Sequence, residues 1–193
     1  YGREIMQNLA LKKIEYPAIG ESLYRVTLPN GLRLFLLPNT NFHETYGIMT
    51  VKFGSVDTHF VPRGTKQTIH YPAGIAHFLE HKLFEDEQGK DLLQEFVDLG
   101  AESNAFTSFT KTSYLFSTTE NVEECLELLQ DLIGEAFFTE ESVQREQGII
   151  HQEIEMYQDN PEYRLFFSAL ANLYPDTPLA EDIAGNRKSI AEI

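Results

Sequence analysis

The sequence of 193 residues contains one cysteine, Cys125, and no tryptophan. A single cysteine can form neither an internal disulfide nor a thiolate metal cluster, which favours a reducing compartment. No stretch approaches the roughly 20 consecutive apolar residues that cross a bilayer, and residues 1–20 lack the apolar block of a signal peptide. We therefore expect a soluble, cytoplasmic protein with no membrane partner.

Basic residues are also scarce. Fifteen Lys and Arg stand against 30 Asp and Glu, which gives a formal net charge of −15. This balance argues against nucleic acid or an anionic membrane as a partner, and a polypeptide or cationic partner is easier to accommodate. Hydrophobic residues make up 42% of the chain, enough for a buried core, so disorder is excluded.

Short β-prone runs and longer amphipathic runs occur in pairs along the chain. Asn30-Gly31 predicts a hairpin between two strands in 24–37. Further strands are predicted at 46–55, 103–110 and 112–118, a loop at 56–73, and helices at 74–84, 90–99, 122–136, 140–159 and 162–173. Paired strands and paired helices without regular βαβ alternation indicate an α+β fold, an antiparallel sheet with helices packed on one face.

The helix predicted at 74–84 carries the motif His77-Phe78-Leu79-Glu80-His81. At about 100° per residue, His77, Glu80 and His81 share one face of that helix. Two histidines at i and i+4 can hold one Zn²⁺, with the carboxylate beside them free to move a proton. The alternative is a set of ordinary, partly buried polar residues.

The helix predicted at 140–159 offers a third metal ligand. Its apolar stripe contains Ile150 and Ile154, and Glu146 and Glu153 lie together on the shoulder of that stripe, two turns apart. The alternative for this pair is a solvated flank of an acidic helix. A catalytic zinc site takes three protein ligands and leaves one position open, so one of these glutamates can complete the histidine pair.

Together these segments resemble the inverzincin family of zinc metallopeptidases, which includes pitrilysin, insulin-degrading enzyme and mitochondrial processing peptidase. The motif at 77–81 is similar to the family's His-x-x-Glu-His, and 145–154 is similar to its downstream helix with two glutamates. The segment 103–108 resembles the family's Asn-Ala-x-Thr strand, and 28–32 resembles its opening hairpin. The bacterial processing-protease branch, which is cytoplasmic, is the most similar part of the family.

The resemblance implies a zinc-dependent endopeptidase that hydrolyses peptides or small unfolded polypeptides. In it, His77, His81 and Glu153 would bind one Zn²⁺, Glu80 would be the general base that activates water at the metal, and Glu146 would support the site. The family's substrate lies as an added strand on a sheet edge, which implies substrate binding by Ser103, Asn104, Ala105, Phe106 and Thr107. The alternative for this segment is a plain core or edge strand.

Members of the family are longer, with two related halves or a partner subunit enclosing the substrate. The resemblance therefore implies that 1–193 is a single N-terminal catalytic domain, incomplete at its C-terminal end, whose chamber a second homologous half or partner subunit closes. We also expect self-association through apolar surface meant for that half.

Two other function classes remain open. One is a non-catalytic partner subunit or peptide-binding module with the same fold; a structural zinc protein fits badly, because such sites are usually rich in cysteine. We interpret the remaining histidines as surface or structural because they lack partners at ligand spacing: His43, His59, His70 and His151. Cys125 lies in an apolar helical run and is interpreted as a buried, inert thiol.

The ligand set predicts sensitivity to acid. Zinc needs neutral histidines and ionised carboxylates, so we expect both zinc and peptidase activity to be lost below about pH 5.5. Zinc content and peptide hydrolysis measured across the acid range test this, and activity that stays flat down to about pH 4 would contradict it.

Overall fold

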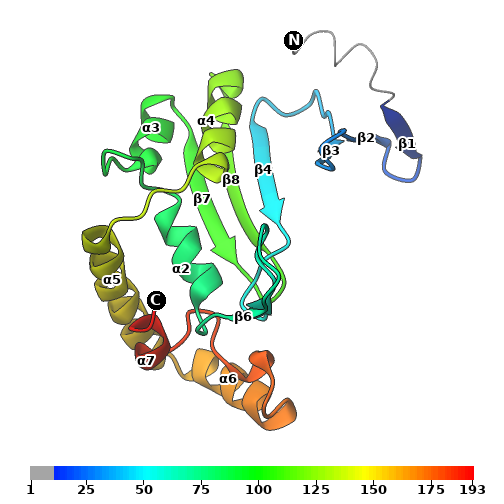
Figure 1. Ribbon diagram of the computed structural model, residues 1–193. Coiled ribbons are helices and arrows are strands. Elements are labelled where there is room, and N and C mark those ends of the chain that lie inside the picture. Colours follow the sequence, from blue (N-terminus) through cyan, green and yellow to red (C-terminus); the bar gives the residue numbers. More distant parts are fainter. Residues whose placement is uncertain (1–10) are drawn as a thin grey trace. The chain divides into compact units, whose positions relative to one another are not determined.

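The computed structural model describes residues 11–193 (Figure 1). The chain divides into two compact units, one ending at His43 and the other running from Glu44 to Ile193. The first unit contains β1 (Lys12–Tyr16), β2 (Glu21–Thr27) and β3 (Arg33–Leu36). The second contains β4 (Thr45–Val51), β5 (His59–Phe60), β6 (Ile69–His70), α2 (Ile75–Lys82), α3 (Leu92–Asp98), β7 (Glu102–Thr107), β8 (Thr112–Thr118), α4 (Val122–Gly134), α5 (Glu140–Gln158), α6 (Pro161–Leu173), a 3-10 turn η1 (Pro178–Ala180) and α7 (Arg187–Ile190).

The first unit is a three-stranded antiparallel sheet in the order β1-β2-β3. Its β2–β3 hairpin turns at the predicted Asn30-Gly31, where Gly31 has a φ of 89° and the amide of Leu32 donates to Asn30 Oδ1 over 3.0 Å. Only glycine adopts such a φ without steric cost, which explains the turn. The sequence analysis did not predict β1, because its run KKIEY is mostly charged and lacks a clear apolar alternation.

The sheet of the second unit is antiparallel, in the order β4-β8-β7. Met49, Tyr114 and Ala105 lie side by side across its three strands, so they share one face. The predicted strands are confirmed, with β7 ending at Thr107 rather than at 110. Among the strands in 11–193, β7 pairs only with β8, so it forms a free edge of this sheet within the described residues.

Helices α2, α3 and α4 pack on one face of the β4-β8-β7 sheet, as predicted, and α5 packs against α2 (Figure 1). Tyr114 and Phe116 project from β8 into a core whose other fully buried members are Phe96, Ala101, Cys125, Leu129 and Leu132. These come from α3, from the residue before β7 and from α4. Cys125 is buried, as the sequence predicts, and burial raises the pKa of its thiol.

A second core joins α2 to α5. Phe78 of α2 packs with Ile150 and Ile154 of α5, and Ala184 and Ile190 close the cluster from the C-terminal segment. The sequence predicts α5 because Thr139 and Ser142 form a capping box at its start and Asn160-Pro161 follows its end. This core fixes the α2 face that carries the histidines against the α5 shoulder that carries the glutamates.

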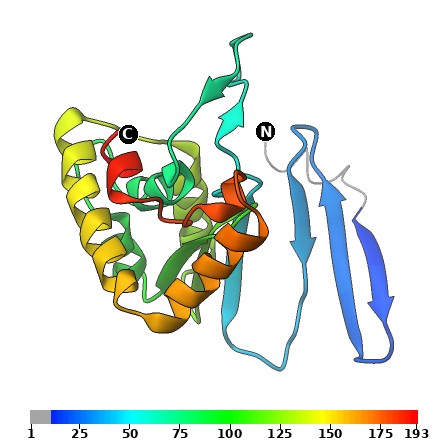
Figure 2. The same cartoon turned by 90° about the horizontal axis from the view of Figure 1, so that it is seen from below.

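The segment 56–73 is not wholly a loop, which corrects the sequence prediction. His59–Phe60 and Ile69–His70 pair as a two-residue antiparallel ladder, β5–β6, and Figure 2 shows this hairpin extending away from the helices. Strands of two residues are too short to give an alternating pattern, so sequence periodicity cannot detect them. Within residues 11–193, none of the helices combines the length and the apolar character that a membrane crossing requires.

Gly74 sets the start of α2. Its φ is 91°, and an added Cβ would lie 2.6 Å from the Ala184 carbonyl oxygen and 2.7 Å from Ile190 Cδ1. Gly64 also has a positive φ, 86°, but nothing lies within 4 Å of its would-be Cβ. Gly64→Ala therefore tests backbone strain alone, whereas Gly74→Ala adds a clash in the α2–α5 core.

We expect Gly64→Ala to lower the free energy of unfolding by about 1–2 kcal/mol, the cost of a left-handed backbone with a Cβ. Gly74→Ala should lower it by at least about 1–3 kcal/mol more, because the core must shift to admit the methyl group. Urea unfolding of both variants measures the difference. Equal losses would show that Ala184 and Ile190 do not restrict this position.

Candidate metal centre

Two histidines of α2 and one glutamate of α5 converge on a common point. His77 and His81 are one turn apart, with their ring centroids separated by 4.6 Å. Glu153 Oε2 lies 3.7 Å from His77 Nε2 and 3.4 Å from His81 Nε2. One ligand atom from each residue falls within 4.8 Å of the others, so the three residues form a cluster that could hold a metal ion.

The three donors fit a zinc ion by chemistry and by spacing. Two imidazoles and one carboxylate form a known ligand set of catalytic zinc, which keeps a fourth position open. Ligand atoms 2.0–2.2 Å from a tetrahedral zinc lie about 3.3–3.6 Å apart, which is close to the two separations from Glu153. His77 Nδ1 is buried and has no hydrogen-bond partner within 11–193, so the ring's accessible donor is its Nε2, which faces Glu153.

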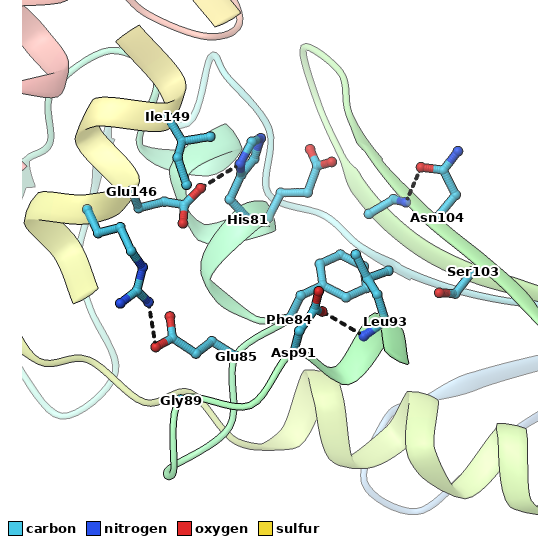
Figure 3. A pocket seen from close by; sticks show the side chains of 13 residues that line it. His81, Phe84, Glu85, Gly89, Asp91, Leu93, Ser103, Asn104, Glu146 and Ile149 are labelled. Carbon is cyan, nitrogen blue, oxygen red and sulfur yellow. Dashed lines mark hydrogen bonds and ion pairs between the residues drawn. The ribbon is translucent and has the colours of Figure 1, made fainter. Parts of the chain in front are cut away.

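Glu146 orients the second histidine. Its Oε1 lies 2.8 Å from His81 Nδ1, and Figure 3 shows the two side chains pointing toward each other from α5 and α2. A carboxylate in this position accepts a hydrogen bond from Nδ1–H, so it selects the tautomer whose Nε2 lone pair faces Glu153. The two glutamates that the sequence places on one shoulder of α5 therefore contact opposite nitrogens of one ring.

Without a metal, the pKa values of the two histidines shift in opposite directions. Burial lowers the pKa of His77 to about 4, and repulsion from His81 adds to this effect, so His77 is neutral at neutral pH. Burial also disfavours the charged form of His81, but the carboxylates of Glu146 and Glu153 outweigh it and raise its pKa to about 9. A metal ion must displace the His81 proton, so its affinity rises with pH up to that value.

Glu153 is kept ionised by its surroundings. The interaction with His81 is the main cause that lowers the pKa of Glu153, and burial of the carboxylate acts in the opposite direction. Tyr157, one turn further along α5, also favours the charged form of this carboxylate. The sequence alone does not predict this role for Tyr157.

Glu80 is held at the edge strand rather than among the metal-ligating atoms. The Thr107 hydroxyl donates to Glu80 Oε2 over 2.5 Å. Burial is the largest effect on this carboxyl and raises its pKa above the ordinary value, although the proximity of Thr107 opposes the shift. Glu80 therefore links the histidine helix directly to β7.

The free edge of β7 runs beside this cluster. The Ala105 amide donates to Asn104 Oδ1 over 2.8 Å in a solvent-exposed bond, so it faces the open edge rather than β8 (Figure 3). The Thr107 amide, two residues along the strand, faces the same edge, because alternate amides point the same way and the Ser108 amide, between β7 and β8, donates to the Lys111 carbonyl oxygen. Ser103, Ala105 and Thr107 turn their side chains toward the helices, whereas Asn104 and Phe106 turn theirs away.

A pocket of about 600 Å³ lies next to the metal-ligating cluster. His81, Glu146 and the β7 residues Ser103, Asn104 and Ala105 line one side of it. Its apolar lining comes from Phe84, Leu93 and Ile149, and Figure 3 shows these side chains arranged around the opening.

An ion-pair network that the sequence analysis missed borders this pocket. Arg145 Nη2 lies 2.8 Å from Glu85 Oε1, and Glu85 also pairs with the buried Lys82 at the end of α2. Together these pairs lower the pKa of Glu85 in spite of its burial. Arg145 directly precedes Glu146, so this network and the His81–Glu146 bond tie α2 to the same turn of α5. No spacing rule links residues 60 positions apart, which is why the sequence did not reveal it.

The other histidines fall into two groups. His43 is exposed, and His151 Nε2 lies 3.1 Å from the Arg187 carbonyl oxygen, which fits their interpretation as surface or structural residues. His59 and His70 do have a partner, because each lies against the other across the β5–β6 hairpin. Their separation of 11 residues matches no helical or loop ligand spacing, so the sequence analysis did not pair them.

Comparisons with known proteins agree with this fold. The family "Insulinase (Peptidase family M16)" matches residues 60–187 of the chain. The chain is 51% identical over 183 residues to the uncharacterized zinc protease YmfH of Bacillus subtilis (strain 168), a match that covers 95% of this chain and 42% of that protein. The chain therefore belongs to the insulinase family, peptidase family M16, as the sequence motifs predict.

Solved structures show the same relation. The crystal structure of an M16-like peptidase from Alicyclobacillus acidocaldarius superimposes with a TM-score of 0.81 at 35% identity, over 96% of this chain and 40% of that one. Pitrilysin superimposes with a TM-score of 0.73 at 19% identity, over 93% of this chain and 19% of its own, and so shares the fold. The chain thus spans about two fifths of the length of YmfH and of the Alicyclobacillus peptidase.

Glu146→Gln tests whether the His81–Glu146 bond supports metal binding. The amide keeps the shape but loses the charge that holds His81 in position, so we expect zinc affinity to fall about 10–100-fold. Glu141→Gln is the matched control, because Glu141 is exposed at the first turn of the same helix. Competition with a chromophoric chelator measures both affinities. Equal affinities for the two variants would show that Glu146 does not support the site.

Proposed function

We propose that this chain is the zinc-binding part of a metalloendopeptidase that hydrolyses peptide bonds in extended peptides or small unfolded polypeptides. The observation that carries the proposal is the convergence of His77, His81 and Glu153 beside Glu80 and a free strand edge. The relative YmfH is described as a zinc protease, which supports the same reading. In this proposal 1–193 is one catalytic domain of a longer enzyme.

His77, His81 and Glu153 would hold one Zn²⁺ per chain. When bound, zinc would supply a Lewis acid for the peptide carbonyl and for water. Glu146 would keep the His81 ring in the binding tautomer through its 2.8 Å contact with Nδ1. Low pKa values at His77 and Glu153 favour the deprotonated donors that a metal needs.

Glu80 would be the general base. Its raised pKa makes it a better proton acceptor than an ordinary carboxylate, and the Thr107 bond aims one oxygen while the other remains for the reacting water. It would take a proton from the attacking water and return that proton to the leaving amine. The same burial that raises the pKa of Glu80 keeps bulk water from competing for this proton.

The substrate would bind as an additional strand on β7. Backbone groups of Ala105 face the open edge, and pairing there would place a peptide carbonyl next to Glu80, because Glu80 is already bonded to Thr107 two residues along. Asn104 would have to release the Ala105 amide before a substrate amide or carbonyl could pair at this position. The roughly 600 Å³ pocket beside Ser103, Asn104 and Ala105 would receive one substrate side chain.

A second homologous half or partner subunit would close the chamber over this edge. The chain covers only 42% of YmfH, so a complete enzyme of that length has more than this part. The α6 helix supports the same inference, because Leu165, Phe166 and Leu173 are largely exposed on it. Self-association of the isolated chain through this surface is part of the proposal. The cytoplasmic location of the protein stays a prediction from its single cysteine.

Glu80→Gln separates an enzyme from a peptide-binding module. Removing the base should lower kcat for a fluorogenic peptide by about 10²–10⁴-fold, the usual contribution of a positioned proton acceptor. The zinc content should stay unchanged, because the Glu80 side chain is bonded to Thr107 and not to Glu153. Glu102→Gln, an exposed carboxylate on β7, is the control that should leave turnover unchanged. A variant that retains turnover would remove Glu80 from the chemistry, and wild-type protein that binds peptide without cutting it would favour the binding module.

Ala105→Pro tests the edge strand. Proline removes the amide that faces the open edge, so we expect KM to rise at least about tenfold, the loss of one well-formed backbone hydrogen bond, with zinc content unchanged. Ala105→Gly also loses the alanine methyl group but keeps the backbone amide, so it is the matched control. Identical kinetics in both variants would exclude this strand from substrate binding.

A further inference from the structure

The β5–β6 hairpin brings together two histidines outside the proposed metal centre. His59 and His70 are direct cross-strand partners in the antiparallel register. Their ring centroids are 4.0 Å apart, and His59 Nε2 lies 2.5 Å from His70 Nδ1. Both side chains are exposed, and neither residue belongs to the His77, His81 and Glu153 cluster.

At this distance one imidazole donates an N–H hydrogen bond to the other. A metal ion that took the place of this proton would bind each nitrogen at about 2.0–2.1 Å, so the two rings would move slightly apart to hold it. Thr58 can select the tautomer of His59. Its hydroxyl oxygen lies 3.0 Å from His59 Nδ1, where it can accept a hydrogen bond from Nδ1–H. That tautomer leaves the Nε2 lone pair directed at His70. A hydrogen bond to the remote ring nitrogen is the usual partner of a metal-binding histidine.

The surrounding backbone fixes this pair in place. The Tyr71 amide donates to the Thr58 carbonyl oxygen over 2.7 Å, directly next to the His59–His70 pair. The rings of Phe60 and Tyr71 stack with their centroids 4.8 Å apart, which adds a packed contact at the same end of the hairpin. The two imidazoles are therefore presented by an ordered backbone and not by two independent loops.

Space and charge next to the pair suit a hydrated cation. Both histidines line a pocket of about 470 Å³, which also contains the carboxylates Asp176 and Glu181. Ser55 lines this pocket too; it is 5% exposed, and its Oγ has no hydrogen-bond partner within the described part of the chain. Carboxylates and a spare hydroxyl can bind the water molecules that complete the coordination of a metal ion held by two residues.

We propose that His59 and His70 form a second divalent transition-metal site, with water filling the remaining positions. Imidazole ligands suit Zn²⁺, Ni²⁺ and Cu²⁺, and Cu²⁺ should bind most tightly of the three. Two protein ligands give a weaker site than three, so this ion exchanges more readily than one held by His77, His81 and Glu153. The bound ion would stabilise the β5–β6 hairpin, whose strands pair over only two residues each, just before the chain enters α2.

Zinc titration calorimetry of the purified protein tests this proposal. The wild-type chain should bind a second, weaker equivalent of Zn²⁺, and His59→Asn or His70→Asn should each weaken that equivalent by at least about tenfold, since either change leaves one imidazole. His43→Asn, which removes an exposed histidine without a histidine neighbour across a strand pair, is the matched control and should retain it. Far-UV circular dichroism confirms that the variants fold.

The double variant His77→Ala, His81→Ala separates the two sites. It should bind a single weak equivalent of Zn²⁺, which disappears when His70→Asn is added. The nitrogen hyperfine pattern of Cu²⁺ bound to the double variant should show two imidazoles. A wild-type protein without a second equivalent, or a second equivalent that survives both His59→Asn and His70→Asn, overturns the proposal. Neither result bears on the first site, so the peptidase proposal is tested separately.

Discussion

The packing of α2 against α5 is the constraint on which the rest of the structure depends. Phe78 of α2 is buried against Ile150 and Ile154 of α5, and this apolar contact sets the rotation of both helices about their axes. With that rotation fixed, His81 can meet Glu146 on one side and Glu153 on the other. Burying a Phe side chain contributes about 1.5–3 kcal/mol, whereas removing His77, His81, Glu146 and Glu153 from water costs free energy. The apolar core therefore stabilises an arrangement that these polar groups alone would not.

Burial and neighbouring charges together give each ionisable group of the site a different protonation state. His77 loses its proton most readily because it is the most buried of the two rings, and His81 keeps its proton because two carboxylates contact it. Glu153 stays ionised through His81 and Tyr157, while the pKa of Glu80 rises because burial outweighs its bond to Thr107. Neighbouring groups whose pKa values are driven apart are typical of sites that bind a metal and transfer protons.

Much of this could be predicted from the sequence because it depends on helical periodicity. The spacing of His77, Glu80 and His81 defines one face of α2, and Glu146 and Glu153 share a shoulder of α5; both follow from the geometry of one helix. Contacts between distant elements could not be predicted in the same way. The Thr107–Glu80 bond, the Arg145–Glu85 pair and the cross-strand contact of His59 with His70 depend on tertiary packing, and β5 and β6 are too short to leave a pattern.

The central claim is that His77, His81 and Glu153 bind one zinc ion, and elemental mass spectrometry tests it most directly. The purified protein, dialysed against a weak chelator to remove loosely held ions, should retain close to one zinc per chain. The His77→Ala, His81→Ala double variant, treated identically, should retain none. Zinc-free wild-type protein after loading with excess zinc, or equal zinc in both proteins, would contradict the account.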